Sequence, residues 1–226
     1  MIEFAVILPA AGTSERFGGR DKLLEPLAGA TVLQWAVEAF LVRQDVGEIV
    51  IATRDERKLR AALKSDPRIS FCEGGANRAE SVGNALKTVS HAMGYVAIHD
   101  AARPLVSQEL IERVWAAARD HGAAVPAMAV TSTIKLAGDS LPTRVMGTLP
   151  RQALWAVQTP QIGKRVDFLE AMEKCPVPLE EVTDDAQLLE LAGKDVWMVE
   201  GEERNIKITT PIDLQMADQL LRSGRG

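Results

Sequence analysis

Short apolar runs alternate with stretches of helical periodicity along the first 130 residues. Apolar runs typical of buried strands lie at residues 4–8, 48–53, 69–72, 95–99 and 123–130. Apolar residues spaced three or four positions apart predict helices at residues 31–41, 55–63, 78–90 and 108–121. This alternation predicts an α/β fold with a mainly parallel sheet and helices on both faces. Asn77 and Ser107 are the expected N-caps, and Gly122 is the expected stop, of two of these helices.

The pattern changes after residue 130. Two runs at residues 131–136 and 143–149 flank a turn and predict a hairpin that projects from the domain. The remaining elements are expected as a core strand at 153–159, a strand at 196–200 and helices at 164–174, 184–191 and 211–221. No flexible interdomain linker interrupts the chain, so residues 1–226 are expected to form one domain, with an arm at about 131–149.

Composition narrows the classes of function. With 226 residues, 46% of them hydrophobic, the chain can bury one sizeable core. A net charge of −5 argues against a nucleic-acid polymer as partner, because such binding needs a broad basic face. The longest apolar run contains Pro126 and is too short to span a membrane. Cys72 and Cys175 show no metal-ligand spacing, and free thiols in the cytoplasm are expected for them.

The first candidate for chemistry is the loop that follows the first strand. Residues 8–22 combine small residues, glycines and three cations, so backbone N–H groups could approach a phosphate that the cations neutralise. Five residues separate Gly12 from Gly18 and no Gly-Lys-Ser/Thr follows, which excludes a Walker loop. A Gly-x-Gly-x-x-Gly dinucleotide fingerprint is also absent here.

Two further segments follow predicted strands and are expected at the same sheet edge. Asp100 and Arg103 suit a metal–triphosphate site, or they form a pair that ties a turn together. Gly74-Gly75 with Ser81 suits close approach of the backbone to a ligand, or forms an ordinary strand-to-helix turn. His99 either orients Asp100 or is a satisfied core histidine.

The candidate residues include no Ser–His–Asp order and no activated cysteine. Transfer of a nucleotidyl group onto a phosphate needs neither, because a phosphate monoester is largely dianionic at neutral pH and attacks without a general base. The protein must then align two anions and neutralise the transition state, which Lys, Arg and Mg²⁺ can do.

An ordered set of motifs covers almost the whole chain: Pro9-Ala10-Ala11-Gly12 with Arg16 and Lys22, Gly74-Gly75 with Arg78 and Ser81, His99-Asp100-Ala101-Ala102-Arg103-Pro104, Gln158-Thr159-Pro160-Gln161, Thr183-Asp184-Asp185 and Asn205-Ile206-Lys207. The set closely resembles the 2-C-methyl-D-erythritol 4-phosphate cytidylyltransferase family of non-mevalonate isoprenoid biosynthesis. The resemblance implies a Rossmann-like nucleotidyltransferase fold. It also implies that CTP and methylerythritol phosphate react, with Mg²⁺, to give 4-diphosphocytidyl-2-C-methyl-D-erythritol and pyrophosphate.

The resemblance also implies roles for individual residues. The expected catalytic residues are Arg16, Lys22, Arg151 and Lys207. The expected substrate-binding residues are Pro9, Ala10, Ala11, Gly12, Gly75, Arg78, Ser81, Asp100, Ala101, Arg103, Thr133 and Thr159. Asp100 is also expected near Mg²⁺. The family forms homodimers through the arm, so Thr133 is expected to reach the partner's site.

Three residues depart from the family pattern: Glu15, Ala76 and Arg204. Arg204 bears on the sugar-side contacts, which leaves a ribitol-phosphate or other polyol-phosphate cytidylyltransferase as the nearest alternative. A non-catalytic nucleotide-binding regulator is the alternative of another class. The complete cation set argues against it, because binding alone would not require both reacting phosphates to be held.

Overall fold

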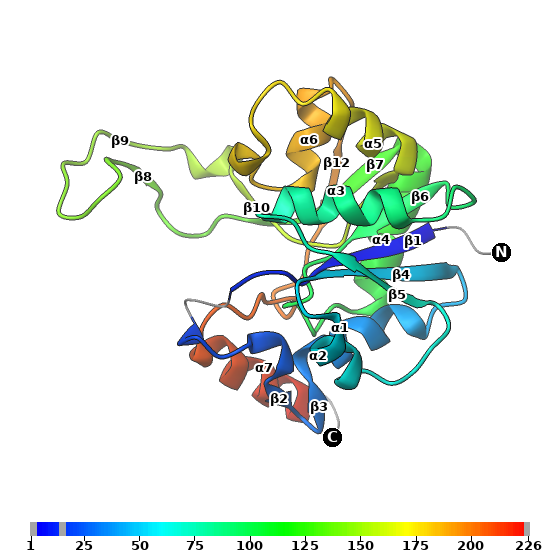
Figure 1. Ribbon diagram of the computed structural model, residues 1–226. Coiled ribbons are helices and arrows are strands. Elements are labelled where there is room, and N and C mark those ends of the chain that lie inside the picture. Colours follow the sequence, from blue (N-terminus) through cyan, green and yellow to red (C-terminus); the bar gives the residue numbers. More distant parts are fainter. Residues whose placement is uncertain (1–3, 14–16, 224–226) are drawn as a thin grey trace.

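In the computed structural model, residues 4–13 and 17–223 are described, and within them eight strands form one sheet (Figure 1). The strand order is β10-β7-β11-β6-β1-β4-β5, and β12 pairs with β7. The strands are β1 (Phe4–Pro9), β4 (Val46–Thr53), β5 (Ile69–Glu73), β6 (Tyr95–Ile98), β7 (Ala123–Ala129), β10 (Trp155–Val157), β11 (Gln161–Lys164) and β12 (Trp197–Glu200). The fold class predicted from the sequence is confirmed.

Parallel pairing dominates the part of the sheet that carries the site. Strand β1 pairs in parallel with both β4 and β6, and β4 pairs in parallel with β5. The carboxyl ends of these four strands therefore lie along one sheet edge, where ligands bind in open α/β sheets. The antiparallel strand β11 lies between β6 and β7.

Helices cover both faces of the sheet (Figure 1). On one face lie α3 (Arg78–Thr88), α5 (Arg165–Glu173) and α6 (Asp185–Leu191). On the other lie α1 (Val32–Leu41), α2 (Glu56–Ala61), α4 (Gln108–His121) and α7 (Pro211–Ser223). Two short strands, β2 (Pro26–Leu27) and β3 (Ala30–Thr31), form a separate hairpin beside α7.

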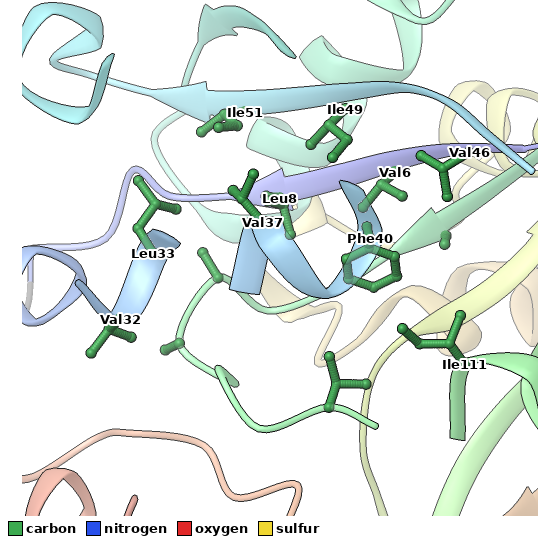
Figure 2. Close-up of a cluster of buried hydrophobic side chains, with 14 of the residues drawn as sticks. Val6, Leu8, Val32, Leu33, Val37, Phe40, Val46, Ile49, Ile51 and Ile111 are labelled. Atoms are coloured by element: carbon green, nitrogen blue, oxygen red, sulfur yellow. The ribbon is translucent and has the colours of Figure 1, made fainter. Parts of the chain in front are cut away.

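Helix α1 shows how the apolar pattern builds the core (Figure 2). Its stripe of Val32, Leu33, Val37 and Phe40 is fully buried beside the apolar side chains of β1 and β4. Burial of each such side chain stabilises the fold by about 1.5–3 kcal/mol. Thr31 caps the helix, since its side chain accepts a hydrogen bond from Gln34 N at 3.1 Å. This packing anchors the strands whose ends carry the site.

The predicted helix ends are confirmed where a cap marks them. Asn77 accepts from Glu80 N, and Ser107 accepts from Leu110 N, as N-caps of α3 and α4. Gly122 ends α4 with a φ of +95°, a conformation that glycine adopts at little cost.

Two predictions after residue 130 need correction, and one strand was missed. The strand predicted at 153–159 is not a core strand: β10 spans three residues, all exposed, including Trp155. Strand β11 was not predicted at all. The arm holds much shorter strands than expected, β8 (Lys135–Leu136) and β9 (Gly147–Thr148), because the arm has no core to pack against. Figure 1 shows this arm reaching away from the sheet.

Candidate active site

A cavity of about 390 Å³ opens where β1, β4, β5 and β6 end. The residues that line it are Pro9, Ala10, Ala11, Gly12, Thr13, Lys22, Leu23, Arg54, Gly75, Ala76, Asn77, Arg78, Ser81, Asp100, Ala101, Ala102 and Lys207. The three segments that the sequence placed at one sheet edge therefore meet there. Arg16 and Glu15 lie outside the described residues.

The first wall of the cavity is the loop after β1. Ala10 N donates to Ala52 O at 2.8 Å, which holds the start of this loop against β4. A Cβ atom on Gly74 would lie 2.3 Å from Ala11 Cβ, so the two loops pack too closely for any other residue there. Lys22 begins a 3₁₀ turn capped by Asp21, whose carboxylate accepts from Leu23 N at 3.1 Å. This turn brings Lys22 to the cavity.

The second wall is the turn between β5 and α3. Ser81 is almost fully buried, and its hydroxyl accepts from Gly75 N at 3.0 Å and donates to Asn77 O at 2.9 Å. Asn77 Oδ1 accepts from Glu80 N at 2.8 Å, and the Glu80 carboxylate accepts from Asn77 Nδ2 at 3.2 Å and from Ala76 N at 2.8 Å. The segment is thus an ordinary strand-to-helix turn with a capped helix, and it also lines the cavity where the backbone can approach a ligand.

Asp100 is surrounded by three cationic side chains at the site. Its Oδ1 lies 3.2 Å from Arg78 Nε, and its Oδ2 lies 2.8 Å from Lys207 Nζ and 3.4 Å from Arg103 Nε. Burial opposes ionisation of this carboxyl, but these three cations outweigh it and hold its pKa well below the usual range. Asp100 is therefore a carboxylate at any physiological pH.

Arg78 also pairs with a second carboxylate, that of Asp185. Its Nη1 and Nη2 donate to the two carboxylate oxygens of Asp185 at 2.9 and 2.6 Å. The Asp185 side chain is only 1% exposed, so this bidentate pair fixes Arg78 from a buried carboxylate. Burial opposes the charge on Arg78, but Asp185 and Asp100 outweigh it and raise its pKa. Sequence reasoning named Asp185 only within a motif and gave it no role.

Buried hydrogen bonds hold the backbone that carries Asp100. Thr159 Oγ1 accepts from Asp100 N at 3.0 Å and lies 3.1 Å from His99 Nδ1. His99 Nε2 lies 3.0 Å from Arg103 O, which can only accept, so the imidazole proton is assigned to Nε2 and Nδ1 accepts from Thr159. Burial lowers the pKa of His99 to about 4. His99 is thus a satisfied core histidine, and no hydrogen bond joins it to the Asp100 carboxylate.

The segment after β12 completes the cluster. Arg103 Nη1 donates to Asn205 O at 2.7 Å, and Asn205 Nδ2 donates to Thr159 O at 2.8 Å. These bonds place Lys207 beside Asp100. Arg103 and Thr159, both expected to bind substrate, do not line the cavity. They hold the loop that carries Asp100.

Two expected site residues belong to the arm and its base instead. Thr133 is exposed, and Arg151 Nη1 donates to Thr131 O at 2.6 Å at the base of the arm. Neither residue lines the cavity of this chain. Arg204 also faces elsewhere, because its Nη2 donates to Leu220 O at 3.0 Å on α7.

The donor set fits Mg²⁺ that arrives with a triphosphate. Among the described residues, Asp100 is the single carboxylate that lines the cavity, and no group of three or more His, Cys, Asp or Glu is placed to hold a metal ion. Mg²⁺ is commonly bound by one or two carboxylates together with substrate phosphates, which suits such a site.

Comparison with known proteins decides the family. The profile of the IspD family, described as 2-C-methyl-D-erythritol 4-phosphate cytidylyltransferase, matches residues 4–223. The chain belongs to the IspD family. It is 40% identical to an IspD enzyme from Symbiobacterium thermophilum, over 97% of this chain and 93% of that one. It is also 40% identical to one from a Synechococcus species, over 96% of this chain and 95% of that one.

Solved IspD structures share the fold. That of Anaerococcus prevotii superposes with a TM-score of 0.83 at 29% identity, covering 97% of this chain and 98% of that one. That of Thermus thermophilus superposes with a TM-score of 0.77 at 35% identity, covering 97% and 99%. Within the described part of the chain, no helix is long and apolar enough to cross a membrane.

Proposed function

We propose that this protein joins CTP and 2-C-methyl-D-erythritol 4-phosphate. A phosphate oxygen of the acceptor attacks the α-phosphorus of CTP and forms a new P–O bond. The bond between the α- and β-phosphates breaks, and pyrophosphate leaves with its electron pair. The single observation that carries this proposal is the cationic cavity of an IspD chain, which Lys22 lines and in which Arg78 and Lys207 pair with Asp100.

The two substrates are assigned to different walls. The loops formed by Pro9, Ala10, Ala11, Gly12, Gly75 and Ser81 are assigned to the nucleotide. Lys22, with Arg16, neutralises the triphosphate as negative charge builds up in the transition state. Lys207 and Ala101, on the Asp100 side of the cavity, are assigned to the acceptor. Arg103 and Thr159 keep that side in place.

Mg²⁺ is expected to be held by Asp100 and by phosphate oxygens of CTP. When bound, the ion neutralises charge on the triphosphate. The fixed backbone of Asp100, held by Thr159, keeps its carboxylate directed at the cavity.

The arm supports a homodimer. It exposes apolar side chains that a monomer would leave in water, among them Leu141 at 87% and Met146 at 59% exposed. Docking of a second copy on the arm would bring Thr133 and Arg151 to the partner's cavity, which explains why they lie outside their own.

Cys72 and Cys175 are unpaired, as suits a reducing cytoplasm.

Two of the three departures from the family pattern, Arg204 and Ala76, do not favour another acceptor, and the third, Glu15, lies outside the described residues. Arg204 is turned toward α7, and Ala76 lines the nucleotide wall rather than the acceptor side. A polyol-phosphate cytidylyltransferase of other specificity is therefore the weaker candidate. A pure nucleotide-binding regulator would not need Lys207 beside Asp100.

The test is pyrophosphate release with CTP, Mg²⁺ and four separate acceptors: methylerythritol phosphate, ribitol phosphate, erythritol phosphate and glucose 1-phosphate. Release with methylerythritol phosphate alone is expected. Pyrophosphate release with another acceptor would show that the acceptor is not methylerythritol phosphate. CTP binding without pyrophosphate release for any acceptor would overturn the enzyme assignment.

A further inference from the structure

Arg54 joins two loops of the cavity, although no sequence motif pointed to it. It follows β4, and its Nη2 donates to Gly75 O at 3.0 Å and to Ala76 O at 3.3 Å. Its side chain also lines the cavity. An exposed arginine that holds two consecutive backbone carbonyls fixes the orientation of both peptide groups.

The N–H groups of the same turn are already used inside the protein. Each of three consecutive amides, from residue 74 to residue 76, donates to an acceptor of this chain. The pairs are Gly74 N with Thr53 O at 2.9 Å, Gly75 N with Ser81 Oγ at 3.0 Å and Ala76 N with Glu80 Oε2 at 2.8 Å. A ligand that lies against this turn therefore meets carbonyl oxygens rather than N–H groups.

A carbonyl oxygen has two lone pairs, so each carbonyl that Arg54 holds can still accept one more hydrogen bond. A wall of acceptors distinguishes the two pyrimidines. Cytosine carries an exocyclic amino group, a donor, where uracil carries a carbonyl oxygen, an acceptor. The amino group of cytosine is therefore complementary to this wall of acceptors, whereas the carbonyl oxygen of uracil is repelled by it.

We propose that Arg54 is a positioning residue that aims the Gly75 and Ala76 carbonyls at the amino group of cytosine and thereby sets the preference for CTP over UTP. The proposal rests on the proposed function, which assigns the nucleotide to this wall. It concerns the base alone and leaves the reacting phosphates to Lys22 and Lys207.

The experiment compares dissociation constants of CTP and UTP, by isothermal titration calorimetry, for the wild type, Arg54→Met and Arg54→Lys. Arg57→Met is the matched control, because Arg57 is an exposed arginine near by on α2 that does not line the cavity. Arg54→Met is expected to weaken CTP binding about tenfold, the scale of one hydrogen bond, and to leave UTP binding nearly unchanged. Arg54→Lys keeps a cation and is expected to recover part of the preference.

Activity gives a second readout. The KM for CTP is expected to rise in Arg54→Met while kcat at saturating CTP stays within about twofold, as for a lost ground-state contact. Equal weakening of CTP and UTP would show that Arg54 contacts the phosphates and would overturn the proposal, as would no change in either. If melting shows Arg54→Met to be unfolded, Arg54→Lys carries the comparison. Failure of the wild type to bind CTP would contradict the proposed function itself, whatever Arg54 does.

Discussion

Lys207 Nζ lies 2.8 Å from Asp100 Oδ2, so an ion pair joins the segment after β12 to the loop after β6. A phosphate monoester carries up to two negative charges and can compete with this single carboxylate for the lysine. The pair therefore marks the place where the acceptor phosphate is expected to bind.

Replacing Lys207 with Ala is expected to act mainly on the acceptor. The loss of this cation should raise the KM for methylerythritol phosphate by roughly 10-fold or more, the scale of a charged hydrogen bond, and leave the dissociation constant of CTP unchanged. Steady-state kinetics with each substrate varied in turn checks this. A defect confined to CTP would show that Lys207 serves the nucleotide.

Replacing Lys22 with Ala is expected to lower kcat by roughly 10²-fold, because a donor to the transition state is lost. Pyrophosphate release at saturating substrates measures the change. Lys64→Ala is the control, since Lys64 is an exposed lysine paired with Glu38 away from the cavity. A kcat within twofold of the wild type for both variants would remove Lys22 from the catalytic role.

Met146→Asp is expected to break the proposed dimer, because it places a charge on the apolar arm. Sedimentation should change from dimer to monomer, and the KM for the acceptor should rise as Arg151 and Thr133 are lost from the partner's site. Val42→Asp is the control, since Val42 is 69% exposed at the end of α1, outside the arm. A monomeric wild type would contradict the dimer directly.

Acid is expected to destabilise the protein through His99. Its pKa of about 4 lies below the ordinary 6.5, so the unfolded chain binds a proton more readily. The stability that His99 contributes is complete above pH 6.5 and is lost as pH falls toward 4, by about 3 kcal/mol.

Urea unfolding at several pH values checks the His99 effect in the wild type, His99→Gln and the control His121→Gln, at the exposed end of α4. His99→Gln should show a shallower loss of stability between pH 6.5 and 4. The same slope in all three proteins would rule out His99 as the cause.

The Arg78–Asp185 pair predicts a double-mutant result. Arg78→Met leaves the buried Asp185 carboxylate without its bidentate partner and is expected to cost about 3 kcal/mol of stability. Adding Asp185→Asn removes the stranded charge and should recover part of that loss. Free energies of unfolding from urea titration measure both effects, and simple additivity would show that the pair is uncoupled.

Much of the fold was predictable because it depends on local patterns. Periodicity located α1, and periodicity together with capping residues located α3 and α4, since an amphipathic stripe and a side-chain cap are both encoded within one segment. Strand β11 escaped prediction because it is short, contains Gly163, and is formed only by pairing with β6 and β7, which are distant in sequence.

The site was predictable in part for the same reason. The segments around Gly12, Gly75 and Asp100 follow strands, and parallel strand ends meet at one edge. The roles of Arg54 and Asp185 depend on long-range contacts with Gly75 and Arg78, which no spacing in the sequence reveals. Thr159 is the opposite case: the motif pointed to it as a substrate-binding residue, but in the structure it holds the Asp100 backbone and does not line the cavity.

The order of the chain also has a consequence for synthesis on the ribosome. Strands β1, β4, β5 and β6, with the nucleotide wall, belong to the first hundred residues, whereas Asp185 and Lys207 belong to the last fifty. Domains are made from the N-terminus onward, so a nascent chain carries the nucleotide wall long before the lysine that neutralises Asp100 emerges. A product truncated after β12 therefore contains every strand of the sheet but lacks Lys207, the cation assigned to the acceptor phosphate.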